Sequence, residues 1–451
     1  MPTGKLSAFV CNTSYNDIPL DVIEHGKLVF LDWLGVTLAG SRNKMGSVMA
    51  DMIAELDGEN GPQQATMIGK GIKTDMIKAA LANGSMSHVL DLDDYHGPTL
   101  SHPTVAFLPA VLAVAEYKKL SGKDLVTALI IAFDILVRVG YGAKRLHYDR
   151  GWHATSTLGK FGAAAGAGKL LNLDAEALGN AFGIAGTTAG GLRLVFGNMG
   201  KSFHAGKASM DGVLAAILAQ KGFDCSRNIL EGKHGFMDLF SDEPDMDKML
   251  DKLGEFFHLP TVSFKPYASC GATHSTIDLM KEIRRRENIN IEDVEEILLD
   301  VTKIAGDASG QIEPKSGLEG KFSVYFCAAL ALSDGEAGID KFTDEKVNNP
   351  QLVTLRKKVK LNIIPDLELA FRAKALVKMK DGAEYLAETD APKGSPQNPI
   401  SYIELAEKFK GLASNVIPDQ NVDKLIALIE NLDKLQDVGE LMGLCSCKLG
   451  E

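Results

Sequence analysis

Four short segments of this chain carry the groups that could move protons or hold an anion. Their sequences are LDLDDYHGPTLSHPT (90–104), DRGWHATST (149–157), FGNMGKSFHAGK (196–207) and FKPYASCGATH (264–274). Each sets histidine, lysine or carboxylate groups beside glycine, proline or small residues. Histidine exchanges protons near neutral pH, and lysine is a compact charge that suits a carboxylate. We therefore expect one cationic pocket, assembled from distant segments, that binds a carboxylate substrate and moves protons.

In the first segment the main acid–base candidate is His102. Asp91, Asp93 and Asp94 precede it, in a stretch that two prolines mark as a loop at the end of a helix. A nearby carboxylate such as Asp91 could hold the imidazole in one tautomer and raise its basicity. For Asp93 and Asp94 the alternative is a solvated acidic loop with one capping aspartate.

The second and third segments offer a further base and several cations. His153 precedes Ala-Thr-Ser-Thr, whose hydroxyls could cap a helix, so it is either a base or a neighbour of that cap. Lys201 stands beside glycine, where it could hold a carboxylate or an enolate oxygen. A solvated lysine is the alternative. His204 and Arg193 add to the cationic surroundings.

The fourth segment begins at Lys265 and continues to Cys270 and His274. Cys270 could be a nucleophile with His274 as its base. A buried, unreactive thiol is the alternative interpretation of a single cysteine in such a segment.

Motifs for phosphate and metal sites are incomplete. GAAAGAGKLL (162–171) has Ala163 where a phosphate loop needs glycine, and Leu170 where it needs serine or threonine, so close helix packing explains it better. DLDDYHG (91–97) lacks the glycine and glutamate of an EF-hand. The sequence contains no HExxH, CxxC or GxSxG motif. We therefore expect neither a phosphate loop nor a metal site.

Charge and cysteine content narrow the class of protein. The chain has 451 residues and a formal net charge of −11, which argues against a nucleic-acid partner. An acidic protein that binds an anion must gather its cations locally, as the four segments do. The six cysteines are sparse and form no disulfide pattern, and Cys445 and Cys447 have no second pair nearby to complete a metal site. We expect a cytoplasmic location.

We also expect no membrane partner. The first residues contain no long apolar segment, so no signal peptide is predicted. The longest apolar stretch, VTALIIAFDILVRVG (126–140), contains Asp134 and Arg138 and is shorter than the roughly 20 residues of a membrane span. It predicts a buried helix.

Helical patterns dominate the first part of the chain, and the character changes near residue 260. Helices are predicted at 20–40, 74–90, 104–122, 124–142, 157–173, 175–192, 208–222, 275–288, 322–335, 400–414 and 421–441. Strand-like alternation is found at 294–303, 355–363 and 368–382. We predict a mainly α fold, in which a large all-α domain is built from both chain ends (1–262 and 396–451). A smaller α+β domain (263–395) is inserted into it.

Together, these segments resemble the MmgE/PrpD family, and the resemblance runs nearly end to end with the segments in the family's order. The family includes 2-methylcitrate dehydratase, cis-aconitate decarboxylase and iminodisuccinate epimerase. The resemblance implies a helical domain built from both chain ends, a smaller α+β lid and a homodimer. It also implies that neither a metal nor an organic cofactor is needed.

The resemblance further implies which residues act. Positions of the decarboxylase active site fall on Asp91, His102, His153, Lys201 and Lys265. The remaining expected substrate contacts are Tyr95, Arg193, His204, Cys270 and His274. Tyr95 and Cys270 replace the threonine and histidine of animal decarboxylases, and LDDYH and YASCGATH look more like the fungal decarboxylase and many bacterial members.

The expected activity is that of a cofactor-independent lyase, a dehydratase or decarboxylase. Its substrate would be a small di- or tricarboxylic acid such as 2-methylcitrate or cis-aconitate. In this family a base or acid works next to a carboxylate while cations hold the developing charge. One alternative is an epimerase of a dicarboxylic acid such as iminodisuccinate. Another is a non-catalytic binding protein that keeps the family fold.

Overall fold

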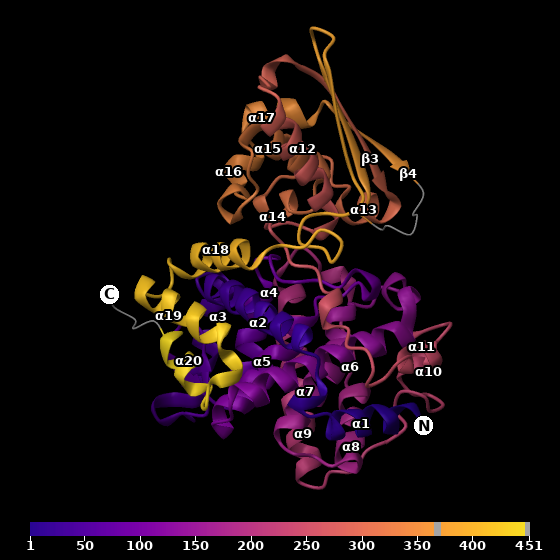
Figure 1. The fold of residues 1–451 in the computed structure, drawn as a ribbon, viewed down its shortest axis with the longest axis vertical. Coiled ribbons are helices and arrows are strands. Elements are labelled where there is room, and N and C mark those ends of the chain that lie inside the picture. Colours follow the sequence, from indigo (N-terminus) through magenta and orange to yellow (C-terminus); the bar gives the residue numbers. More distant parts are fainter. Residues whose placement is uncertain (365–370, 447–451) are drawn as a thin grey trace. The chain divides into compact units, whose positions relative to one another are not determined.

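The structure is a computed structural model that describes residues 1–364 and 371–446. Contacts divide the chain into two compact units. Unit 1 comprises Met1–Val262 and Ser401–Glu451, and unit 2 comprises Ser263–Ile400. Figure 1 shows the elements of both units. The two units are described in turn.

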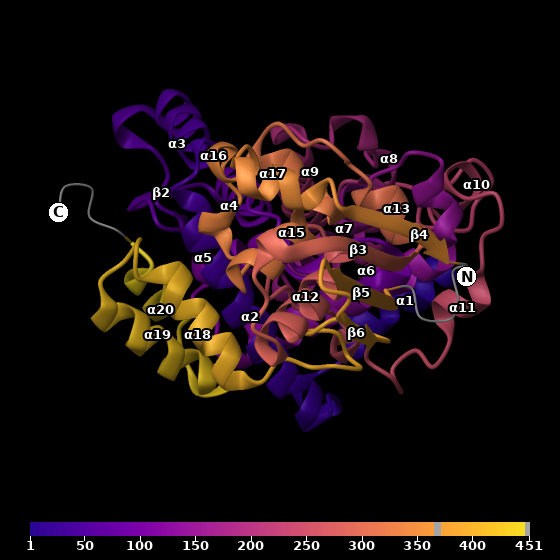
Figure 2. The same cartoon turned by 90° about the horizontal axis from the view of Figure 1, so that it is seen from above.

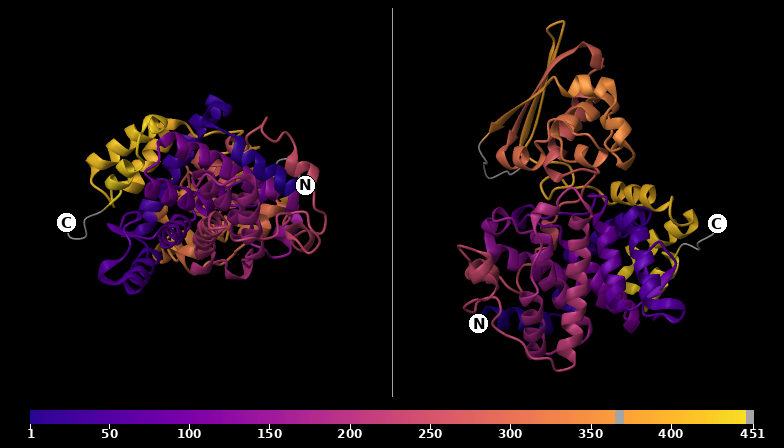
Figure 3. Two further views of the ribbon diagram at one scale, coloured as in Figure 1. Left: turned by 90° about the horizontal axis from the view of Figure 1, so that it is seen from below. Right: turned by 180° about the vertical axis from the view of Figure 1, so that it is seen from behind.

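Unit 1 is built mainly of helices. They are α1 (Pro2–Asn12), α2 (Leu20–Ser41), α3 (Lys44–Asp57), α4 (Met76–His88), α5 (Pro103–Lys118), α6 (Gly122–Asp149), α7 (Ala154–Leu170), α8 (Ala175–Thr187), α9 (Met199–Gln220), α10 (Phe236–Phe240), α11 (Met246–Leu250), α18 (Tyr402–Ala413), α19 (Asp419–Glu430) and α20 (Gly439–Leu444). Helices α18 and α19 pack against α2, so the two chain ends share one unit. Figure 3 shows these yellow C-terminal helices beside the indigo and purple N-terminal ones.

Helices α4, α5, α7 and α9 pack against one another in the core of unit 1. Two glycines let α4 and α9 approach closely. A Cβ at Gly84 would lie 2.7 Å from the Cα of Gly206, and a Cβ at Gly206 would fall on the carbonyl oxygen of Leu81. This approach brings the loop that follows α4 beside the first turns of α9.

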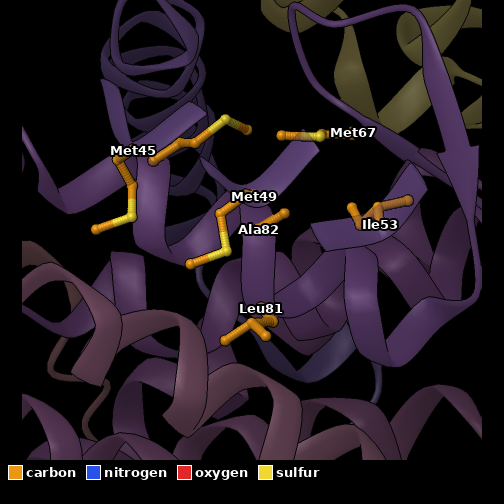
Figure 4. Packing of buried hydrophobic residues seen from close by; sticks show 7 residues of the cluster. Met45, Met49, Ile53, Met67, Leu81 and Ala82 are labelled. Carbon is orange, nitrogen blue, oxygen red and sulfur yellow. The ribbon is translucent and has the colours of Figure 1, made fainter. Parts of the chain in front are cut away.

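A methionine-rich cluster also holds α4. It consists of Met45, Met49, Ile53, Met67, Leu81, Ala82 and Met86, all buried. Figure 4 labels six of these side chains, which come from α3, α4 and the segment between them. Unbranched methionine fills irregular gaps between helices, which suits this junction. α4 is therefore held both by α9 and by this cluster.

The prediction of an all-α domain needs one correction. Unit 1 contains an antiparallel hairpin of β1 (Ala65–Met67) and β2 (Ile72–Thr74). Its turn has positive φ angles of 72° at Gly69 and 64° at Gly71, a region that glycine adopts without strain. With three residues in each strand, the hairpin is too short to show a recognisable alternation in the sequence.

Helix α6 includes the apolar stretch that predicts a buried helix. Within the described residues it is the one helix that could cross a membrane by length and composition, yet 94% of its most apolar window is buried in the structure. Its Arg138 and Asp134 form a fully buried ion pair of 2.5 Å. Burial of this kind is the environment of a core helix.

Unit 2 combines helices with a four-stranded sheet in the order β4-β3-β5-β6. The strands are β3 (Val294–Thr302), β4 (Val359–Ile364), β5 (Ala373–Met379) and β6 (Glu384–Thr389), and the helices are α12 (His274–Arg286), α13 (Lys303–Ser309), α14 (Gly317–Gly320), α15 (Val324–Asp334), α16 (Asp344–Val347) and α17 (Pro350–Arg356). Strand β3 is parallel to β4 and antiparallel to β5. α12 and α15 pack against the sheet (Figure 2).

Two predicted strands differ from the observed ones. The predicted strand 355–363 is partly helical, since Asn349 and Pro350 start α17, which continues to Arg356 before β4 begins. Proline at the first helical position is preorganised for a helix start. The predicted strand 368–382 begins outside the described residues and is observed as β5.

Candidate active site

The loop between α4 and α5 carries most of the site. α4 ends at His88, the chain turns at Asp91 with a left-handed φ of 54°, and His102 is the N-cap of α5. Aspartate tolerates this backbone region because its short polar side chain can hydrogen-bond locally. The N–H of His102 donates to Thr155 Oγ1 at 3.0 Å. The loop is thus tied to α4, α5 and α7.

Asp93 is the centre of the polar network in this loop. Its carboxylate oxygens lie 3.0 and 2.9 Å from Nδ1 of His88, and its Oδ2 lies 2.9 Å from Nδ1 of His102. Asp93 and His88 are each 1% exposed. Although burial raises the pKa of Asp93, the charges of His88 and His102 hold that pKa well below its usual value. Asp93 is therefore an ionised carboxylate between two imidazoles.

Asp91 pairs with a lysine. Lys201 Nζ lies 2.5 Å from Asp91 Oδ1, and the two side chains are 11% and 8% exposed. The sequence suggested Asp91 as the carboxylate beside His102, and the structure shows that Asp93 also contacts this ring. The left-handed turn at Asp91 brings its carboxylate to the ammonium on α9.

His153 joins the group from the start of α7. It is the N-cap of α7 and is 1% exposed. Its Nδ1 lies 2.9 Å from Nδ1 of His204, so one ring donates and the other accepts. Burial lowers the pKa of His153 well below its usual value, and the neighbouring positive charges of His88 and Lys201 act in the same direction. His153 is therefore neutral near pH 7.

Helix α9 carries Lys201 and His204 three residues apart, a spacing that places both on one helix face. The side chain of Asn198 caps this helix by accepting from Gly200 N at 2.8 Å. The predicted helix began at residue 208, whereas α9 begins at Met199. Burial lowers the pKa of His204.

Four imidazoles lie close together as a result. Ring centroids are separated by 4.6 Å between His88 and His102, and by 5.2 Å between His153 and His204. His88 and His153 stack at 6.0 Å with an angle of 17° between their planes. Neutral and charged forms of these rings must influence one another at such distances.

Tyr95 and Arg193 also belong to unit 1. Tyr95 is 8% exposed within the loop between α4 and α5. The Arg193 guanidinium sits 3.8 Å from the ring centroid of Tyr148, and its Nη1 donates to the Tyr148 carbonyl at 3.1 Å. Arg193 also faces Phe196, whose ring meets His153 edge-on at 4.9 Å. The structure thus places Arg193 one aromatic ring away from the imidazoles.

Lys265, Cys270 and His274 all belong to unit 2. Lys265 is 1% exposed, and Cys270 is half-buried with its N–H donating to the Lys321 carbonyl at 2.9 Å. Nε2 of the buried His274 lies 3.3 Å from the Ser269 carbonyl. That these three residues act together with those of unit 1 stays a prediction.

His88, Asp91, Asp93 and His102 have donor atoms that suit a divalent metal. One ligand atom of each lies within 4.8 Å of the others. The same residues already form a hydrogen-bonded network with Lys201, so a metal ion would have to displace a proton or the ammonium. The absence of a metal requirement stays a prediction.

Sequence reasoning missed His88 and gave Asp93 no clear role. His88 ends a helix of small residues, ANGSMSH, which suggested packing rather than chemistry. Its position was the available signal, because a histidine at the last helical residue, five positions before an aspartate, can turn back onto the loop that follows.

Comparisons with known proteins agree over both units. Residues 4–249 match the model of the MmgE/PrpD N-terminal domain, and residues 267–434 match that of the MmgE/PrpD C-terminal domain. The chain is 28% identical over 477 residues to the cis-aconitate decarboxylase of Aspergillus terreus (strain NIH 2624 / FGSC A1156), covering 99% of this chain and 96% of the fungal protein. It is 28% identical over 440 residues to the Homo sapiens cis-aconitate decarboxylase, covering 94% and 90%. For the Mus musculus enzyme the identity is 27% over 462 residues, covering 98% and 93%.

Proposed function

Because this chain belongs to the MmgE/PrpD family, we propose that it is a lyase that decarboxylates a small unsaturated tricarboxylic acid such as cis-aconitate. The observation that carries the proposal is the largely buried group of His102, His153 and Lys201. The relatives named above are cis-aconitate decarboxylases, so they favour loss of CO₂ over dehydration of 2-methylcitrate and lend no support to an epimerase.

The reaction needs one proton donor and several cations. A proton adds to the alkene carbon that carries a hydrogen atom and a carboxylate. The other alkene carbon bears a methylene group, and the carboxylate on that methylene leaves as CO₂. The electrons of the broken C–C bond form the new double bond, and those of the old double bond form the C–H bond. Cations near the remaining carboxylates stabilise the charge that develops.

His102 is the proposed proton donor. Its Nδ1 lies 2.9 Å from Asp93 Oδ2 and 3.0 Å from the Asp94 carbonyl, so the proton that it exchanges with substrate passes through Nε2. An ionised carboxylate at Nδ1 stabilises the imidazolium form. A positioned acid of this kind contributes about 10²–10⁴-fold in rate.

The other residues have supporting roles in this proposal. His153, which burial keeps neutral, accepts a proton or a hydrogen bond from the substrate. The Lys201 ammonium, which pairs with Asp91 in the structure, binds a substrate carboxylate in place of Asp91. For Lys265 the same role rests on the family resemblance alone. No metal or organic cofactor takes part in the proposed mechanism.

One assay tests the reaction class. The protein is incubated in deuterated water with cis-aconitate, 2-methylcitrate, citrate, itaconate and iminodisuccinate, and the products are followed by proton NMR. We expect cis-aconitate to give itaconate with one carbon-bound deuterium and CO₂. Water loss from 2-methylcitrate would replace the decarboxylase by a dehydratase. Deuterium uptake without mass loss would replace it by an epimerase, and binding without turnover by a binding protein.

A variant pair tests the assigned donor. His102→Ala should lower kcat by about 10²–10⁴-fold with an unchanged circular dichroism spectrum. His234→Ala is the control, because the His234 side chain is 73% exposed in another loop, and it should stay within about twofold of wild type. Full activity of His102→Ala contradicts the assignment.

We also propose that the protein is a cytoplasmic homodimer. Leu192, Leu194, Phe203 and Leu214 are 53%, 90%, 41% and 36% exposed on α9 and the segment before it. Apolar side chains gathered on a surface are typical of a protein–protein interface. Light scattering should give twice the chain mass, and the mass of one chain would contradict a dimer.

The proposed cytoplasmic location rests on the cysteines. In the described residues the free cysteines are Cys11, Cys225, Cys270, Cys327 and Cys445, which fits a reducing compartment. Cys447 lies outside the described residues.

A further inference from the structure

His88 has no role in the reaction as derived above, yet it shares the carboxylate that supports the proposed proton donor. Asp93 receives His88 Nδ1 at 2.9 Å and His102 Nδ1 at 2.9 Å on the same oxygen, Oδ2. We propose that His88 is a positioning residue that, through Asp93, orients the ring of His102 and limits the stabilisation of its protonated form. This inference rests on the proposed function for the role of His102.

The direction of the hydrogen bonds follows from the charge of Asp93. Its pKa is held well below the usual value, so near neutral pH it is a carboxylate that can only accept. Both imidazoles must therefore donate from Nδ1, and each can exchange a second proton only at Nε2. His88 and His102 are fixed in the same tautomer by one shared acceptor.

Sharing this acceptor weakens its effect on each ring. A carboxylate that accepts from two donors has its charge partly compensated by each of them, so it stabilises an imidazolium less than a carboxylate with one donor. Without His88 the full charge of Asp93 acts on His102. Protonated His102 then persists to higher pH, and it also releases its proton to substrate less readily.

The fold holds His88 rigidly enough for this role. It is the last residue of α4, which packs against α5 and α9, and its ring lies 4.6 Å from that of His102 and 6.0 Å from that of His153. In the described part of the chain, its buried Nε2 has no hydrogen-bond partner. The Asp93 contact is thus the polar contact that orients its ring.

Other polar and charged groups lie on the elements around this pair, and substitutions at His88 leave their side chains chemically unchanged. They are Asp91 and Asp93 in the loop, Asp94 bonded to Thr104 at the start of α5, His153 and Lys160 on α7, and Lys201 and His204 on α9. A shift in the titration of His102 can therefore be assigned to the hydrogen bond from His88 Nδ1 only by comparing variants that keep this donor with variants that lack it.

Three substitutions separate the donor from the bulk of the ring. In His88→Asn the amide nitrogen takes the place of Nδ1 and can still donate to Asp93. In His88→Gln it takes the place of Nε2, and in His88→Leu the donor is lost. The readouts are the pH profile of kcat/KM and the ¹⁵N shift of His102 Nε2, titrated without substrate and assigned with His102→Ala.

We expect His88→Gln and His88→Leu to move the His102 titration to higher pH by about one unit, the equivalent of one charge-assisted hydrogen bond. kcat should fall about tenfold, whereas His88→Asn should keep the titration and most of the rate. The proposal would be overturned if His102 titrated at the same pH in the wild type and in all folded variants. It would also be overturned if kcat fell equally in the His88→Asn and His88→Gln variants, because that result would indicate direct contact of His88 with substrate. If the Leu variant does not fold, the Asn and Gln pair decides. The NMR titration needs no turnover, so an inactive wild type refutes the proposed function and leaves this test intact.

Discussion

Asp91 Oδ1 and Lys201 Nζ lie 2.5 Å apart, although 110 positions separate them in the sequence. The pair joins the loop after α4 to the first turn of α9, and both side chains are largely buried. The ammonium is thus placed and charge-compensated before any substrate arrives. An anionic substrate must compete with Asp91 for the Lys201 ammonium. Lys201 therefore binds a substrate carboxylate only where that contact is more favourable than the one with Asp91.

Replacing Lys201 by methionine should therefore abolish most of the activity. The variant removes the proposed carboxylate ligand and leaves Asp91 as a buried negative charge that repels the substrate. We expect kcat/KM for cis-aconitate to fall by at least about 10²-fold, from a rise in KM and a fall in kcat together. Steady-state kinetics by NMR or absorbance measure both.

The double variant Lys201→Met/Asp91→Asn separates these two effects. Its KM should be lower than that of Lys201→Met, because the repelling charge of Asp91 is gone. Its kcat should stay as low as that of Lys201→Met. Lys207→Met is the control, since its side chain is 35% exposed and pairs with Asp211 on the same helix. An unchanged kcat/KM in Lys201→Met would show that substrate is held elsewhere.

The approach of α4 to α9 is a second condition for this ion pair. Gly206→Ala places a methyl group on the Leu81 carbonyl of α4 and should force the helices apart. We expect a loss of about 1–3 kcal/mol in the free energy of unfolding, measured by urea titration, and reduced kcat because Lys201 moves away from Asp91.

Gly411→Ala is the matched control on α18. An added Cβ there has nothing within 4 Å, and alanine is the better helix former. This variant should be more stable by about 0.5–1 kcal/mol and fully active. If Gly206→Ala behaves in the same way, close packing does not position the site.

Helices α4 and α9 show what the sequence could and could not reveal about the fold. The helical periods predicted α4 and the second half of α9, and small residues indicated close helix packing. The predicted helix began only at residue 208, after Gly200 and Gly206 in the first turns of α9. The close approach to α4 that requires glycine at 206 is a tertiary contact, which the sequence does not show. Family membership, predicted from the four segments, is confirmed.

The choice between neighbouring carboxylates was beyond the sequence. Asp91 and Asp93 are two positions apart, and either could have faced His102. In the structure Asp91, in a left-handed backbone conformation, pairs with the ammonium that α9 brings to it, and Asp93 contacts His102. Neither is visible in residue spacing, since both depend on tertiary packing.

Arg138 should be among the most important residues for stability. It is fully buried, pairs with Asp134 and donates to the carbonyls of Asp251 at 2.7 Å and Phe256 at 2.9 Å. Arg138→Met leaves Asp134 as an unpaired buried charge, so the free energy of unfolding should fall by about 3–5 kcal/mol. Urea titration followed by circular dichroism measures this loss.

Helix α6 supplies a matched control for this variant. Arg145 also pairs with an aspartate four residues away, Asp149, but the two side chains are 48% and 47% exposed. Arg145→Met should therefore change stability by no more than about 0.5 kcal/mol. Similar losses in both variants would mean that burial of the Arg138 pair adds nothing.

Asp94 gives the protein a distinct dependence on pH. Burial raises the pKa of Asp94 from 3.8 to about 8, although a hydrogen bond from Thr104 opposes the shift. The charges of Asp32 and Asp93 add to it. Between these values the folded protein binds the proton more tightly than the unfolded chain, so this contribution is complete below pH 4 and is lost as the pH rises through 8. A shift of about four units corresponds to roughly 5 kcal/mol.

Asp94→Asn keeps the shape of the side chain and removes its titration. The wild type should lose stability between pH 6.5 and pH 9, while the variant should change little over this range and be the more stable protein at pH 9. This window avoids the buried His25, His96, His147 and His258, whose lowered pKa values of about 4, 3, 4 and 4 affect stability only in acid. Urea titrations at pH 6.5, 7.5 and 9 measure the difference. Parallel curves for the two proteins would show that Asp94 is already ionised at pH 6.5, and the conclusion that it is protonated beside Asp93 would then be wrong.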